Sequence, residues 1–112
     1  MLPAPARMRR GAEFTSTVRG GSRAAGRSLV VHWSRGAANL HVGFVVGRAV
    51  GGAVTRNRVR RRLRHLVRDR LPTLPSTGSL VVRANPPAAT VSAAGLARDL
   101  DAALARVVVS AR

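Results

Sequence analysis

The middle of the chain carries a strong helical pattern of apolar residues. Five apolar side chains recur at helical spacing between positions 59 and 71, on an arc of about 140° at ~100° per residue. They are Val59, Leu63, Leu66, Val67 and Leu71. The stripe predicts a helix with one face on a core. Gly51 and Gly52 precede it where the chain must turn, Thr55 is a candidate N-cap, and Pro72 cannot continue the helix.

The remaining patterns predict a small sheet and two more helices. Short β-branched or alternating runs bounded by loop residues are typical of strands, and three occur: Ser28–Trp33, Leu40–Gly47 and Ser79–Ala84. A short basic segment, 9–19, and a segment with an apolar stripe, Ser92–Ser110, predict helices, the latter with Ser92 as N-cap. We expect the glycine- and arginine-rich segment 20–27 to be a loop. The order α-β-β-α-β-α predicts an α+β fold, a small mixed β-sheet covered by helices.

Length and composition limit the function classes. A chain of 112 residues is expected to form one domain, 9–112, after a flexible leader, 1–8. Cysteine is absent, which excludes disulfides, zinc–thiolate sites and thiol nucleophiles. No apolar run approaches the ~18 residues of a membrane span and no signal peptide is visible, so we expect a cytoplasmic protein. The acids and histidines are scattered, which predicts ordinary half-exposed histidines rather than a metal site or a catalytic pair.

The charge distribution predicts a polyanionic partner. All 20 basic side chains are arginines, the net charge is +16 and the pI is about 12.0. Eight of the arginines lie between positions 56 and 70, accompanied by one acid, Asp69. On the predicted helix, the face opposite the apolar stripe carries Asn57, Arg61, Arg64 and Arg68. Guanidinium groups are planar, permanently charged and bidentate toward phosphate, so this surface favours RNA or DNA.

Pattern and composition alone leave alternatives open. One is a solvated charged face without a partner, although such faces usually mix both signs. Another is a non-catalytic RNA- or DNA-binding module of ribosomal or helix-turn-helix type. A third is a cationic membrane-surface helix, against which the strands and the core-sized apolar stripe argue. Trp33 and Phe44 are more typical of a core than of base stacking, and we expect Arg83 to face solvent or RNA.

The residues around the basic helix resemble the signature of the bacterial ribonuclease P protein subunit. Residues 43–64 read G-F-V-V-G-R-A-V-G-G-A-V-T-R-N-R-V-R-R-R-L-R and match the family pattern at twelve positions. These are Gly43, Phe44, Val46, Val50, Gly51, Ala53, Val54, Arg56, Asn57, Arg58, Arg61 and Arg64. Arg48 and Arg60 stand where the family has Lys. The N-terminal R-M-R-R-G-A-E-F is similar to the family's first helix through Arg7, Met8, Arg9, Glu13 and Phe14.

The resemblance implies a function and a topology. Proteins of this family pair with a large catalytic RNA, and the complex is an endoribonuclease that removes the 5′ leader of precursor tRNA. The RNA carries the chemistry and most of the Mg²⁺, so no catalytic or metal-binding residue is expected in the protein. Neither a small-molecule substrate nor a membrane is implied as a partner. The family fold contains a left-handed βαβ crossover, an exception to the usual hand.

The resemblance also implies two sites. The first is an RNA-binding face formed by Arg48, Arg56, Asn57, Arg58, Arg60, Arg61, Arg64 and Arg68. The second is a cleft between the first helix and the sheet that holds the single-stranded leader, formed by Arg10, Phe14, Val18 and His32. Val18 stands where the family usually has Phe, and His32 where it often has an aromatic ring. We therefore expect Phe14 to supply most of the base stacking.

Overall fold

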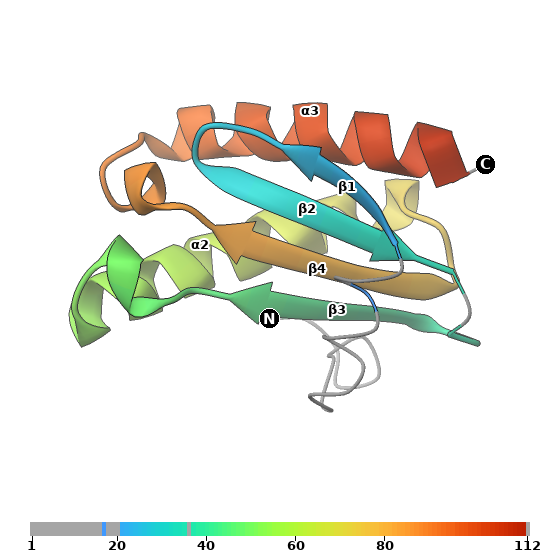
Figure 1. Cartoon of the computed structure of the whole chain (residues 1–112), viewed down its shortest axis with the longest axis horizontal. Coiled ribbons are helices and arrows are strands. Elements are labelled where there is room, and N and C mark those ends of the chain that lie inside the picture. The colour runs from blue at the N-terminus through green and yellow to red at the C-terminus, as the bar shows by residue number, and fades with distance from the viewer. Residues whose placement is uncertain (1–16, 18–20, 36, 112) are drawn as a thin grey trace.

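The structure is a computed structural model that describes residues 17, 21–35 and 37–111, with side chains described as far as residue 107. Two long helices cover one face of a four-stranded sheet (Figure 1). The predicted leader, most of the predicted first helix, and Arg10, Phe14 and Val18 lie outside the described residues.

The sheet is mixed, as predicted. Its strands are β1 (Ser22–Ala25), β2 (Leu29–Ser34), β3 (Leu40–Val45) and β4 (Gly78–Ala84), in the spatial order β1-β2-β4-β3. β2 pairs antiparallel with both β1 and β4, whereas β3 pairs parallel with β4. Three of the strands were predicted within two residues at each end, and β3 ends at Val45 because Gly47 already caps the next turn.

The strand β1 was not predicted, because its segment was expected to be a loop. Of its four residues, Ala24 is buried on the core side, whereas Arg23 and Ala25 are exposed. Such a short strand with one core side chain has no alternating apolar pattern to detect. Its pairing with β2, in register from Ser22 opposite Trp33 to Ala25 opposite Val30, holds it in the sheet.

The long helices are α2 (Ala53–Arg70) and α3 (Ala93–Ala111), joined to the strands through the short 3-10 turns η2 (Arg48–Val50), η3 (Leu71–Thr73) and η4 (Pro86–Ala89). The predicted cap of α3 is confirmed, because the Gly95 N–H donates to Ser92 Oγ at 3.0 Å. The predicted cap of α2 is wrong. Thr55 lies inside the helix, and Gly52 is the N-cap without a side-chain hydrogen bond. The turn before it is made by Gly51, whose φ of 153° favours glycine.

The connection from β3 through α2 to β4 is left-handed. The two strands are adjacent and parallel, so the chain must cross over between them. Figure 1 shows both strands running to the left, with β4 above β3 and α2 behind the sheet, and this path turns opposite to the right-handed crossover of nearly all such units. The expectation from the family resemblance is confirmed.

The core lies between the helices and one face of the sheet. The predicted stripe of α2 contributes the fully buried Val59, Leu63 and Val67, while Leu66 and Leu71 pack at its edge. The strands and α3 supply Leu29, Val31, Trp33, Val42, Leu80, Val82, Leu96, Leu100, Leu104 and Val107. Because side chains alternate along a strand, the residues between these point to the other face of the sheet.

Candidate RNA-binding surfaces

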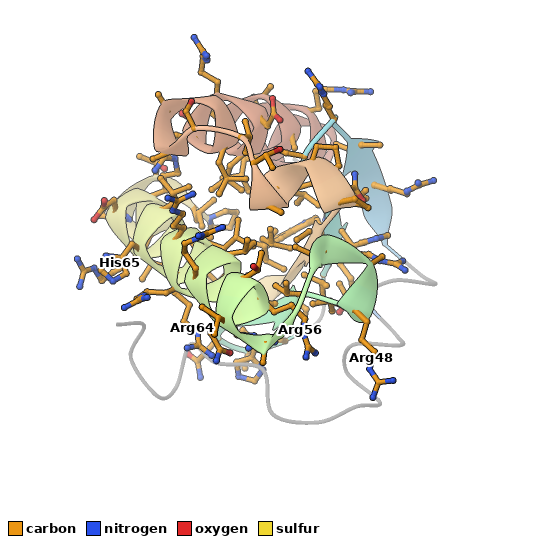
Figure 2. The ribbon with its side chains drawn as sticks, turned by 90° about the vertical axis from the view of Figure 1, so that its left-hand side faces the viewer. Arg48, Arg56, Arg64 and His65 are labelled. Atoms are coloured by element: carbon orange, nitrogen blue, oxygen red, sulfur yellow. The ribbon has the colours of Figure 1, made fainter. Side chains whose placement is uncertain are left out.

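The outer face of α2 is a continuous cationic surface. We call it the arginine face and define it by Asn57, Arg61, Arg64 and Arg68, which are all exposed and lie opposite the buried stripe, as predicted. Its flanks carry the half-buried Arg56 and Arg60 on one side and Arg58 and Arg62 on the other. Figure 2 shows Arg64 and His65 projecting outward from this helix.

Two flanking arginines are held in place by hydrogen bonds. Arg60 donates through Nη1 to Asn57 Oδ1 at 3.0 Å, one helical turn earlier. Arg58 donates through Nη2 to the carbonyl oxygen of Ala89 at 3.2 Å, which ties α2 to η4. Side chains that are already oriented lose less entropy when they bind a ligand. Each flank therefore presents one guanidinium group in a preset position beside the exposed arginines of the outer face.

The arginine at the end of α2 has a structural role instead. Arg70 donates to Asp101 of α3 through Nε, and through Nη2 at 3.0 Å, and its Nη1 donates to the carbonyl oxygen of Leu66 at 2.9 Å. The hydrogen bond from Arg70 lowers the pKa of Asp101, and the same bond raises the pKa of Arg70. This pair joins the two helices and lies apart from the arginine face.

The acids that the structure describes do little to neutralise the arginine face. Asp99 accepts hydrogen bonds from the Ser28 hydroxyl and from the Ser28 N–H, the latter at 3.2 Å. Asp101 is engaged by Arg70, as described. Asp69 lies 3.9 Å from Arg68 in an exposed pair, and such pairs are worth about 0–1 kcal/mol. Seven arginines of α2 precede Asp69, so the positive field over the helix is almost unopposed.

Two shallow hollows lie along the arginine face. One, of about 460 Å³, is lined by Asn57, Arg60, Arg61, Arg64 and His65, and the other, of about 380 Å³, by Arg58, Arg61, Arg62, His65, Leu66 and Ala93. Arg62 and His65 were not among the predicted site residues. Their helical spacing from Arg58 and Arg61 was the signal that could have included them. Arg48 projects from η2, beyond the start of α2 (Figure 2), so it extends the cationic surface at one end.

The sheet face turned away from the helices is the second candidate surface. We call it the open sheet face because neither α2 nor α3 covers it, although Val30, His32 and Val81 on it are buried. The register sets its side chains in rows across the strands. One row runs from Arg23 through His32 and Val81 to Gly43, and the next contains Val30, Arg83 and Val45. A hollow of about 520 Å³ at this face is lined by Arg23, Val30, His32, Val45, Gly47, Ala49, Val50, Arg83, Ala84, Asn85 and Pro86.

His32 is the one predicted leader-cleft residue in the described part of the chain, and it lines this hollow. It is 5% exposed, so the expectation of a half-exposed histidine was wrong for this residue. Burial, and then the positive charges of Arg23 and Arg83, lower its pKa. Trp33 points the opposite way into the core at 3% exposure, as expected, and Arg83 is exposed.

The comparisons with known proteins decide the family. A family model described as Ribonuclease P matches residues 2–108. The chain belongs to the ribonuclease P protein family. The ribonuclease P protein component of Nocardioides sp. is 54% identical over 111 residues, covering 96% of this chain and 95% of that protein. The corresponding protein of Streptomyces bikiniensis is 52% identical over 118 residues and covers 96% of each.

Solved ribonuclease P proteins share the fold. The protein from Staphylococcus aureus superposes with a TM-score of 0.82 at 23% identity, over 92% of this chain and 97% of that one. The protein from Thermotoga maritima gives a TM-score of 0.76 at 22% identity, over 86% and 92%. As a ribonuclease P protein component, this chain is a subunit of an endoribonuclease ribonucleoprotein that processes tRNA.

The described part of this ribonuclease P protein offers neither a metal cluster nor a membrane span. Across residues 17, 21–35 and 37–111, no group of three His, Cys, Asp or Glu side chains is placed to hold a metal ion. In the same part of the chain, no helix is long and apolar enough to span a bilayer. Because Asp99 and Asp101 also accept hydrogen bonds from Ser28 and Arg70, the described residues fit a protein-held metal ion poorly.

Proposed function

We propose that this protein binds the catalytic RNA of ribonuclease P through the arginine face of α2 and the 5′ leader of precursor tRNA on the open sheet face. Bound in this way, it assists the endonucleolytic removal of the leader, which gives the mature 5′ end of the tRNA. The observation that carries the proposal is the arginine face itself. In α2, seven arginines precede the first acid, Asp69, and the opposite side of the helix is buried. The chain also belongs to the ribonuclease P protein family.

The physical basis of RNA docking is counterion release. Each arginine that neutralises a phosphate frees condensed cations, so binding weakens steeply as salt rises. The outer arginines are exposed and can follow an irregular RNA backbone, whereas Arg58 and Arg60 are preset by their hydrogen bonds to Ala89 and Asn57. Bidentate guanidinium–phosphate pairs add geometric selectivity to this general attraction. Arg48 and Arg56 lengthen the same surface toward η2.

We assign the chemistry and the Mg²⁺ to the RNA subunit. The three acids of the described residues are spread over α2 and α3, and Asp99 and Asp101 already accept hydrogen bonds from Ser28 and Arg70. Mg²⁺ prefers several oxygen ligands in near-octahedral geometry, which these separated carboxylates do not supply. The protein's part is then to bind and position RNA, with no catalytic side chain of its own.

Reconstitution with a bacterial ribonuclease P RNA tests the proposal. The protein should raise cleavage of precursor tRNA by the RNA at low Mg²⁺, where electrostatic support from the arginines matters most. Protein freed of RNA should not cleave precursor tRNA. Metal-dependent cleavage by such a preparation would refute the assignment of the chemistry to the RNA. RNA binding without any stimulation of cleavage would instead point to a general RNA-binding module.

A further inference from the structure

Two arginines from different strands flank His32 on the open sheet face. Arg23 of β1 lies directly opposite His32 of β2, and Arg83 of β4 lies opposite Val30, one row away. With strands about 4.8 Å apart and about 3.4 Å per residue along them, the two arginine Cα atoms are about 12 Å apart. Two long side chains can converge across such a span. Arg23, His32 and Arg83 all line the hollow of about 520 Å³.

The wall of this hollow contains a buried, neutral imidazole. His32 is 5% exposed, and its Nδ1 has no hydrogen-bond partner within the described part of the protein. An unsatisfied buried polar atom is rare in native proteins and costs about 1–3 kcal/mol. The lowered pKa keeps His32 neutral at physiological pH, so one of its ring nitrogens is an acceptor and the other a donor.

The charge at this site is also unbalanced. Arg23 and Arg83 are both exposed. The three aspartates of the described residues lie on α2 and α3, where Asp99 accepts from Ser28, Asp101 accepts from Arg70 and Asp69 lies beside Arg68. Around the arginines, Val30, Val45 and Pro86 form apolar parts of the lining. A hollow with two cations, a neutral imidazole ring and an apolar wall suits a nucleotide, which combines an anionic phosphate with a sugar and a base.

We propose that Arg23 and Arg83 form a phosphate-binding subsite for the backbone of the single-stranded leader, with the His32 ring between them in the wall of the hollow. This subsite rests on the proposed function, and it names residues of the leader surface outside the predicted aromatic cleft. The open sheet face is turned away from α2 (Figure 1), so its phosphate belongs to a different RNA segment from those on the arginine face. Such an anchor holds a leader of any sequence, because every nucleotide carries the phosphate.

The test compares non-cleavable precursor tRNA with mature tRNA as ligands of the holoenzyme. The Arg23→Ala/Arg83→Ala variant should reduce the preference for precursor by about tenfold at moderate salt, since two guanidinium contacts are lost. The control Arg35→Ala/Arg98→Ala removes the same charge from exposed positions elsewhere and should keep the preference. If the wild-type holoenzyme prefers precursor and the double variant keeps that preference, the subsite is overturned but the proposed leader function is not. A wild-type holoenzyme without that preference would overturn the proposed leader function as well.

Chemical substitution of the leader provides a second measurement that needs no protein variant. Uncharged methylphosphonate linkages, placed one at a time along the leader, should weaken wild-type binding most at one position. The Arg23→Ala/Arg83→Ala holoenzyme should be insensitive at that same position, which is the signature of a direct pair in a double-mutant cycle. Equal sensitivity of both holoenzymes at every position would show that the arginines touch no leader phosphate.

Discussion

The arginine face can be tested by removing its outermost charges. Arg61, Arg64 and Arg68 are exposed, and within the described residues their only ion pair is the loose 3.9 Å contact of Arg68 with Asp69. Replacing all three by alanine leaves the buried stripe of α2 intact. Alanine also has the highest helix propensity, so the helix should be at least as stable in the variant.

The magnitude follows from the polyelectrolyte behaviour of RNA. If each of the three arginines neutralises one phosphate, the slope of log K against log salt should become less negative by about 2.1–2.7. Over a rise from 50 to 200 mM salt, the ratio of variant to wild-type dissociation constants should then shrink by about twenty- to fortyfold. The wild-type protein should therefore bind far better at low salt, and the two proteins should converge at high salt.

The assay is filter binding of the catalytic RNA at several salt concentrations. A control variant with Arg35, Arg98 and Arg106 replaced by alanine loses the same formal charge from other exposed positions, and its slope should stay close to that of the wild type. An unchanged slope in the arginine-face variant would refute the docking surface. Equal changes in both variants would show that only net charge matters, without a defined face.

Two further predictions concern stability. Gly78→Ala should lower the free energy of unfolding by about 1–3 kcal/mol, because a Cβ there would lie 2.5 Å from Trp33 Cη2 at a φ of +111°. A melt followed by the fluorescence of Trp33 measures this, and an unchanged midpoint would contradict it. The RNA-free protein should lose stability as the pH falls below about 6.5. The folded state holds the pKa of His32 below its unfolded value, so unfolding takes up a proton in that range. His32→Gln should flatten this part of the profile, and a profile identical to wild type would refute the role of His32.

The helices were predictable because their signals are long and redundant. α2 and α3 span 18 and 19 residues, so several turns repeat the same apolar stripe and local exceptions do not obscure it. The cationic character of α2 was equally visible, because on a helix the spacing of arginines fixes which ones share a face. Ser92 was recognised as a cap because it comes directly before an apolar-striped segment.

What escaped prediction depends on contacts between distant segments. β1 is a strand because β2 pairs with it, and Arg23 carries no local sign of that role. Arg23 and Arg83 are 60 positions apart in sequence, and only the register of three strands brings them to either side of His32. The start of α2 was misplaced for a local reason. Glycines supply the turn, so the usual side-chain cap at Thr55 is unnecessary.

The hand of the crossover explains why the two proposed RNA-binding surfaces lie on separate sides of the protein. With the strand order β1-β2-β4-β3, a left-handed path places α2 on the face of the sheet that α3 also covers (Figure 1). A right-handed path between the same strands would place α2 over the other face, on top of His32 and Arg83. The proposed leader surface and the hydrophobic packing of α2 would then compete for one side of the sheet. The left-handed connection instead leaves that side free of α2 and turns the arginine face outward, so the two proposed RNA-binding surfaces do not compete for one side of the sheet.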